Sequence, residues 1–261
     1  MKKDLKEKFG FTLAEGATHV GIFHNTRRVG FTLAEVLITL GIIGIVSAMT
    51  IPTLVKNYQK KVLNTQFVQA YSILNQALRM TTSQYDYPVR CYYKSTDYEY
   101  ELGALVLDEC PNFHTKLLNN IKITKKCANN AIERGCLPEY KGYDEIINEY
   151  NPDREAPEGY SSYGEYESRG CIYFRKSGLK DIPVYNLNNG SILFLFNKSM
   201  PVLAVDVNGF AGPNKWGYDV FSFSIVNDGK AHKLGRDVCM WPEKGGVISL
   251  EKINEVIKGN Y

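Results

Sequence analysis

The pattern of hydrophobic positions separates the chain into distinct segments, and one of these, residues 31–55, is apolar on every side. Residues 31–55 carry one charged side chain, Glu35. At a helical rise of about 1.5 Å per residue the run spans roughly 37 Å, more than the ~30 Å hydrocarbon thickness of a bilayer. The pattern therefore predicts a membrane-spanning helix. Its small residues, among them Gly41, Gly44 and Ser47, favour close packing of such helices on one another.

After Val55 the helical period continues, but only one face stays apolar. The positions that recur at spacings of three and four are Leu63, Phe67, Ala70, Leu74, Ala77 and Leu78. This pattern predicts one long helix from about Phe31 to Met80, whose second half packs one face on a globular domain. Pro52 removes a backbone hydrogen bond and should bend this helix without ending it.

The remaining chain predicts an irregular region followed by a small sheet. Short helices are expected at 102–107, 113–123 and 143–150, and residues 151–170 are expected to form an exposed loop. Three β-rich runs follow at 191–197, 201–207 and 219–226, with a turn at 227–229, a short strand near 232–234 and a helix over 248–257. Together these segments predict an α+β fold in which the long helix lies on an antiparallel sheet.

Composition narrows the class of function. The chain has 261 residues, of which 44% are hydrophobic and 23% charged, which suits one globular domain plus a membrane segment. A formal net charge of +3, dispersed along the chain, does not predict nucleic-acid binding. The four histidines are scattered and no catalytic motif accompanies them, so no enzyme is predicted. His114 and His232 are expected at the surface.

Six cysteines follow the membrane segment: Cys91, Cys110, Cys127, Cys136, Cys171 and Cys239. An even number in an exported region predicts disulfides that staple the long connection, with all 15 pairings open. A zinc site is the weaker alternative, because no C-x2-C spacing is present.

Glu35 needs an explanation of its own. A carboxylate on a membrane helix costs at least a few kcal/mol unless it is neutral, reaches the interface or finds a cation. A cut between Gly30 and Phe31 would create an α-amino group four residues away, which a neighbouring subunit in an assembly could offer to Glu35. Otherwise Glu35 is a side chain that reaches the interface at the end of a plain membrane anchor.

These residues carry a family resemblance. Arg28-Val29-Gly30, followed by Phe31-Thr32-Leu33-Ala34-Glu35 and an apolar run, resembles the N-terminus of type IV pilins and type II secretion pseudopilins. The resemblance implies cleavage after Gly30 by a prepilin peptidase, which also methylates Phe31, and a helix bend at Pro52. It further implies insertion in the bacterial inner membrane, an exported C-terminal domain, and assembly with identical or related subunits into a pilus or pseudopilus.

The predicted organisation has five parts. They are a cytoplasmic leader (1–30), a transmembrane or filament-core helix (31–55), its amphipathic continuation (56–82), a cysteine-containing connection (83–189) and a β-meander with a terminal helix (190–261). The leader is polar and basic, which is typical of a segment that stays in the cytoplasm.

Two alternatives concern processing. Gly10–Glu15 duplicates Gly30–Glu35, but the segment after the first copy is too polar to span a membrane, so we interpret it as a non-functional copy rather than a second cleavage site or a sign of a mis-annotated start. Val46-Ser47-Ala48 resembles a signal-peptidase site that would release a chain starting at Met49. The competing class is thus a non-assembling binding protein, either membrane-anchored or secreted.

One segment offers candidate metal ligands. Asp206, Asn208 and Asp219 supply oxygen atoms around glycine-rich turns and could chelate Ca2+, and the segment resembles one found in many pseudopilin-like chains. The alternative, which we favour, is that these side chains cap turns between two strands. No other cofactor is predicted.

Overall fold

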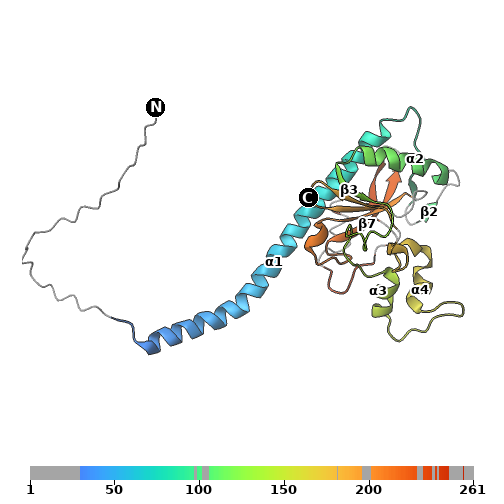
Figure 1. Cartoon of the computed structure of the whole chain (residues 1–261). Coiled ribbons are helices and arrows are strands. Elements are labelled where there is room, and N and C mark those ends of the chain that lie inside the picture. Colours follow the sequence, from blue (N-terminus) through green and yellow to red (C-terminus); the bar gives the residue numbers. More distant parts are fainter. Residues whose placement is uncertain are drawn as a thin grey trace, which may run out of the picture. The chain divides into compact units, whose positions relative to one another are not determined.

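The computed structural model describes residues 30–96, 99–101, 106–180, 182–195, 201–227, 232–236, 239, 241–246 and 255 (Figure 1). The chain divides into two compact units, residues 1–51 and 52–261. The predicted helix at 248–257 and the turn at 228–229 fall, apart from Glu255, outside the described residues.

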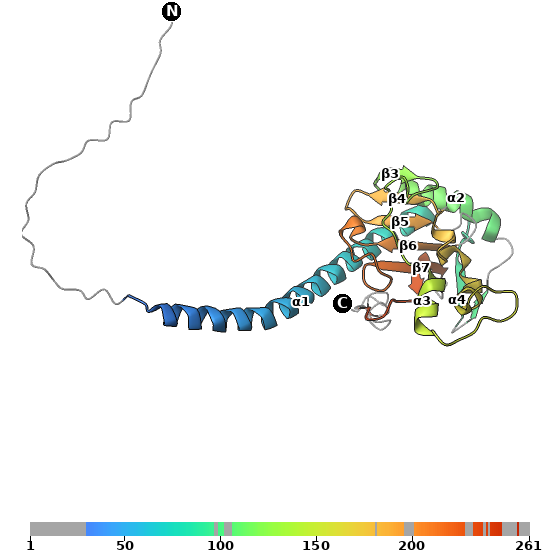
Figure 2. The ribbon, with the colours of Figure 1, turned by 60° about the horizontal axis from the view of Figure 1, so that its bottom comes forward.

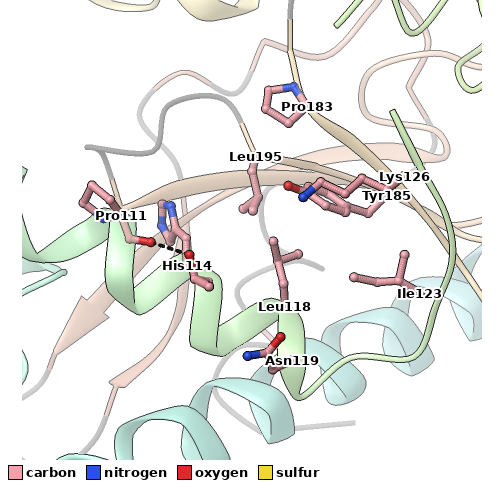
Figure 3. Close-up of a pocket in the computed structure, with 10 residues that line it drawn as sticks. Pro111, His114, Leu118, Asn119, Ile123, Lys126, Pro183, Tyr185 and Leu195 are labelled. Carbon is pink, nitrogen blue, oxygen red and sulfur yellow. Dashed lines mark hydrogen bonds between the residues drawn. The ribbon is translucent and has the colours of Figure 1, made fainter. Parts of the chain in front are cut away.

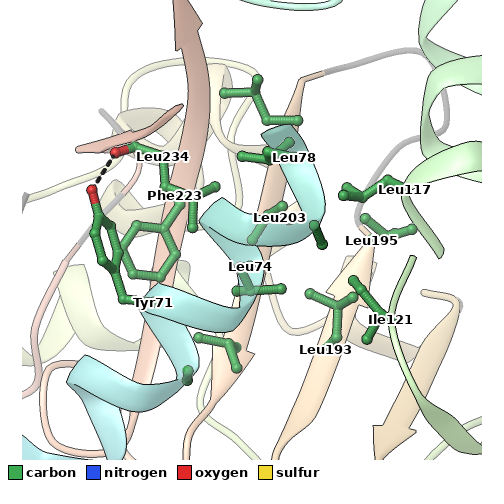
Figure 4. Close-up of a cluster of buried hydrophobic side chains, with 14 of the residues drawn as sticks. Tyr71, Leu74, Leu78, Leu117, Ile121, Leu193, Leu195, Leu203, Phe223 and Leu234 are labelled. Atoms are coloured by element: carbon green, nitrogen blue, oxygen red, sulfur yellow. Dashed lines mark hydrogen bonds between the residues drawn. The ribbon is translucent and has the colours of Figure 1, made fainter. Parts of the chain in front are cut away.

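Helix α1 spans Leu33–Thr82 and continues through Pro52, so the prediction of one long helix is confirmed. Its second half buries one stripe, made of Leu63, Phe67, Ala70, Tyr71, Leu74, Ala77, Leu78 and Thr81. Phe67 is fully buried, with its ring centroid 4.6 Å from that of Phe221 in an edge-to-face contact. Figure 4 shows Tyr71, Leu74 and Leu78 of this stripe over the sheet, next to Leu203 and Phe223.

Within the described residues the sheet has eight strands, and six of them form an antiparallel series in the order β3-β4-β5-β6-β7-β8. Figure 2 shows β3 to β7 of this series in that order. These are β3 (Ile123–Cys127), β4 (Val184–Leu187), β5 (Ile192–Leu195), β6 (Val202–Asp206), β7 (Val220–Asn227) and β8 (His232–Arg236). Strand β1 (Tyr93–Thr96) pairs in parallel with the end of β7 and antiparallel with β2 (Glu99–Glu101). The predicted α+β fold, a long helix on an antiparallel sheet, is therefore confirmed.

Both faces of the sheet are covered. Leu193 and Leu195 of β5 belong to the core beneath α1 and α2 (Val106–Asn119). Ile192 and Phe194 of the same strand belong to a second core. Successive side chains of a strand point to opposite faces, so the two cores lie on opposite sides of the sheet.

The second core is built by the segment between β3 and β4. It contains α3 (Tyr143–Tyr150), the short α4 (Tyr163–Glu167) and the 3-10 turns Ser168–Gly170, Ile172–Phe174 and Gly178–Lys180. The rings of Tyr143 and Phe174 stack with centroids 4.8 Å apart, and Trp216 meets both rings edge-on. A further 3-10 turn, Gly209–Ala211, lies between β6 and β7.

Three disulfides join the six cysteines, as Cys91–Cys110, Cys127–Cys136 and Cys171–Cys239. Disulfide bonding in this part of the chain was predicted, whereas the pairing was open. The first bond ties the segment after α1 to α2, and the third ties the second core to the region after β8.

Several local predictions are corrected by this arrangement. The helix predicted at 113–123 is wrong in extent, because α2 covers Val106–Asn119 and Ile123 already begins β3. Of the helix predicted at 102–107, residues 102–105 lie outside the described residues and residues 106–107 belong to α2. The alternation of side chains in β7 alone favours a strand with one buried face, but residues 220–226 are all buried because both faces of the sheet are covered. The expected loop at 151–170 is largely exposed, yet it contains α4.

Candidate functional site

Three functional residues predicted from the sequence, Gly30, Phe31 and Glu35, lie within six positions at and just before the start of α1. Gly30 and Phe31 precede the helix, and the Phe31 side chain is 86% exposed. A side-chain atom added at Gly30 would meet nothing within 4 Å. Both residues that flank the Gly30–Phe31 peptide bond are thus exposed.

Glu35 closes a reciprocal cap with Thr32. Its Oε2 accepts hydrogen bonds from the Thr32 backbone N–H at 2.8 Å and from the Thr32 hydroxyl at 2.9 Å. The Glu35 backbone N–H donates to the Thr32 Oγ1 at 3.2 Å. This is the capping box, in which two otherwise unpaired donors of the first helical turn are satisfied.

The cap gives Glu35 a structural role that the sequence analysis missed, although the spacing Thr-x-x-Glu before an apolar run was a visible signal for it. The cap uses only one carboxylate oxygen. Among the residues that the structure describes, Oε1 of Glu35 has no hydrogen-bond or ion-pair partner. The side chain is therefore held at the helix end with one oxygen available.

The helix that follows exposes its apolar side chains. The exposed large residues in 31–55 are Phe31, Leu33, Val36, Leu37, Ile38, Leu40, Ile42, Ile43, Ile45, Val46, Met49, Ile51, Leu54 and Val55. Helix α1 is long and apolar enough to cross a membrane. A surface of this kind is stable only when lipid or other apolar helices cover it. Gly41 and Gly44 leave open space on it, which permits close helix contact.

The candidate calcium ligands lie at the loop between β6 and β7. Asp206 is fully buried, and its Oδ1 accepts hydrogen bonds from the backbone N–H groups of Asn208 and Gly209 at 3.1 and 2.7 Å. Its Oδ2 accepts from the Tyr140 hydroxyl at 2.6 Å. Burial and the nearby charge of Asp219 raise the pKa of Asp206 to about 7.

Asp219, like Asp206, accepts hydrogen bonds from backbone N–H groups of a turn. Its oxygens accept from the backbone N–H groups of Asn214 and Lys215 at 2.8 and 2.7 Å, and burial raises its pKa. The Asn208 side chain donates to the Gly212 carbonyl at 2.7 Å. Both carboxylates thus fix turns, and within the described ranges no group of three or more His, Cys, Asp or Glu side chains is arranged to hold a metal ion.

The two histidines of the globular domain are buried, so their predicted surface position is wrong. His114 is 2% exposed and His232 is 7% exposed. Both rings lie beside Phe113, with centroids 6.3 and 6.1 Å from it. No local pattern in the sequence indicates this burial, since it depends on the packing of α2 against β8.

Fold and site together define a pilin-like α+β protein: a long N-terminal apolar helix, an antiparallel sheet under its second half, and three disulfides. Residues 27–51 match the prokaryotic N-terminal methylation motif, the signature of type IV pilins and pseudopilins. The matched segment contains Gly30, Phe31, Thr32 and Glu35 and ends before the sheet domain. It supports a type IV pilin-like or pseudopilin precursor, a class of structural proteins and not of enzymes. No curated protein and no solved structure matches the chain significantly.

Proposed function

We propose that the chain is a prepilin-like structural subunit of a type IV pilus or a type II secretion pseudopilus. A prepilin peptidase cuts after Gly30 and methylates the new amino group of Phe31. The mature subunits then assemble through α1. The observation that carries the proposal is the capped Glu35 beside the exposed residues Gly30 and Phe31, at the head of an apolar helix with exposed side chains.

The proposed topology follows from the charges and the apolar run. The basic leader, residues 1–30, stays in the cytoplasm and is removed, in keeping with the preference of Lys and Arg for that side of the membrane. Residues 31–55 cross the inner membrane and later form the filament core, in which Pro52 bends the helix. Residues 56–261, comprising the amphipathic half of α1, the connection and the β-meander, are exported.

Glu35 supplies the assembly contact in this proposal. Cleavage exposes an amine at Phe31, and methylation leaves that amine positively charged. The free Oε1 of Glu35 pairs with the Phe31 amine of a neighbouring subunit, while Oε2 keeps the Thr32 cap. In a filament core of low dielectric such a pair is strong, and a carboxylate without a partner is costly. The pair therefore selects for processed subunits.

Two variants distinguish the effect of the Glu35–Phe31 ion pair on assembly from the effect of the helix cap formed by Glu35 and Thr32. Glu35→Gln keeps a side-chain oxygen for the Thr32 cap, because Gln also serves in capping boxes, but it removes the charge. Thr32→Val removes the side chain that caps the helix and keeps the charge, at a cost of about 1 kcal/mol in helix-end stability. We expect Glu35→Gln to be cut and methylated but absent from sheared filaments, and Thr32→Val to be incorporated.

Mass spectrometry of the mature N-terminus and quantification of the sheared filament fraction provide the two readouts. Normal incorporation of Glu35→Gln would refute the ion pair. Equal loss in both variants would assign Glu35 to capping alone. A native chain that keeps its leader, or that begins at Met49, would instead establish the anchored or secreted binding protein.

A further inference from the structure

A cavity of 420 Å³ lies between α2 and the β3-β4-β5 side of the sheet. Figure 3 shows Leu118 of α2 and Leu195 of β5 facing it, with Tyr185 and Lys126 at the opposite side from His114. Its volume is in the range of sites that enclose small ligands, which are typically apolar with a few polar groups. The cavity is remote in sequence from the start of α1.

One positive charge, that of Lys126, lies at the cavity beside the neutral hydroxyl of Tyr185. The Lys126 Nζ lies 5.5 Å from the centroid of the Tyr185 ring, and Lys126 forms no ion pair with any described residue. The Tyr185 hydroxyl likewise makes no hydrogen bond within the described chain. Burial raises the pKa of Tyr185, so this hydroxyl stays protonated and able to donate. No Asp or Glu is among the described residues that line the cavity.

His114 adds an unusual feature to the wall. Its side chain is buried, and neither Nδ1 nor Nε2 has a hydrogen-bond partner among the residues that the structure describes. A buried polar group without a partner costs stability, and native structures contain few of them. His114 lies in the cavity wall opposite Lys126 and Tyr185 (Figure 3), and its ring can therefore report on an occupant without binding it.

We propose that this cavity binds a small organic carboxylate with a compact apolar body, such as an aryl acid. The carboxylate lies between the Lys126 ammonium and the Tyr185 hydroxyl. The body packs on Leu118 and Leu195. A cationic ligand is disfavoured because Lys126 has no compensating acid at the cavity, and a purely polar anion leaves the apolar wall without contacts.

Benzoate is a suitable probe, and benzamide is its uncharged analogue of the same shape. The full chain is labelled with 13C-histidine, purified in a non-ionic detergent and titrated with each compound while the ring signals of His114 and His232 are followed by NMR. We expect a saturable shift at His114 with benzoate, and affinity for benzamide at least about tenfold lower, the equivalent of 1.4 kcal/mol.

Lys126→Gln should lower the affinity for benzoate by about tenfold, since one charge-assisted hydrogen bond is lost. Lys125→Gln is the matched control: it removes the same charge from the adjacent position of β3, where the ammonium faces the Arg134 and Gly135 carbonyls and not the cavity. We expect this control to bind benzoate as the native chain does. Leu118→Trp, which fills the cavity, should abolish the shift.

The His232 signal and the thermal unfolding midpoint verify that each variant is folded. Failure of benzoate to produce a saturable His114 shift would overturn the proposal. Equal binding of benzoate and benzamide, or equal effects of the two lysine variants, would also overturn it, because the charge of Lys126 would then have no role in recognition.

Discussion

The buried imidazole of His114 should make the sheet domain sensitive to acid, and the size of the effect can be calculated. His114 lies in α2 with 2% of its surface exposed, and neither ring nitrogen forms a hydrogen bond within the described part of the chain. Burial lowers its pKa from the ordinary value of 6.5 to about 4. The charged form is disfavoured in the folded protein because water cannot solvate it there.

The direction of the change in stability with pH depends on whether the folded or the unfolded state is protonated first. On acidification the unfolded chain protonates His114 near pH 6.5, whereas the folded chain does so only near pH 4. The contribution of His114 to stability is therefore complete above pH 6.5 and is lost as the pH falls toward 4. At 1.36 kcal/mol per pH unit, the loss is about 3 kcal/mol.

Acidification has the opposite effect on the stability contributed by Asp206. Its pKa in the folded chain is raised from 3.8 to about 7, so the folded state takes up this proton first and gains stability as the pH falls through that window. The total pH profile therefore mixes both effects. Comparison of the native chain with His114→Leu at each pH cancels Asp206 and every other unchanged group.

Urea unfolding of both proteins in a neutral detergent, followed by near-UV circular dichroism between pH 7.5 and 4, measures this difference. We expect the free energy of unfolding of the native chain to fall relative to that of His114→Leu by about 3 kcal/mol between pH 6.5 and 4. Above pH 7 the difference should be constant. A difference that is flat or rises with acid would refute a dry, neutral His114.

Three further predictions concern stability. Phe67→Ala should lower the free energy of unfolding by about 3–5 kcal/mol, because a fully buried ring is lost, and a cost below 1 kcal/mol in urea titrations would contradict the packing. Tyr71→Phe removes the 3.0 Å hydrogen bond to the Leu234 carbonyl and should lower the free energy of unfolding by about 1–2 kcal/mol in the same titration. An unchanged urea midpoint would mean that this hydrogen bond does not stabilise the fold. Replacing Cys171 and Cys239 by Ser opens a loop with a sequence separation of 68 and should lower the free energy of unfolding by about 4 kcal/mol. Replacing Cys127 and Cys136, whose separation is 9, should lower it by about 2.6 kcal/mol. If the second replacement lowered the thermal midpoint more than the first, loop entropy would not be the cause.

The elements predicted correctly are those with a strong local pattern. Helix α1 follows from a long apolar run and a continuous stripe, and β5, β6 and β7 follow from dense apolar and β-branched runs. Strand β3 was missed because ITKKC contains two lysines, which suit an edge strand that pairs on one side only. The helices predicted around α2 left out residues 108–112, yet α2 runs through them with Pro111 inside the helix, where a proline is normally unfavourable.

The residues of the candidate site also differ in how strongly the local sequence indicates them. The roles proposed for Gly30, Phe31 and Glu35 rest on their spacing, which is a sequence motif. The role of Thr32 was readable from the capping-box spacing but was overlooked. The burial of His114 had no local signal, because it depends on contacts between segments far apart in the sequence.

The division of the chain into two units predicts that assembly and stability respond to different mutations. Glu35 and its cap lie within residues 1–51, whereas Phe67 and both cores of the sheet domain lie within 52–261. Distant sites without shared partners act independently. Glu35→Gln should therefore leave the urea unfolding of the sheet domain unchanged within about 0.5 kcal/mol while it prevents filament incorporation. Phe67→Ala should leave cleavage after Gly30 intact while it destabilises the domain. If Glu35→Gln also destabilised the sheet domain, its assembly defect would follow from folding, and the ion pair would no longer be needed to explain it.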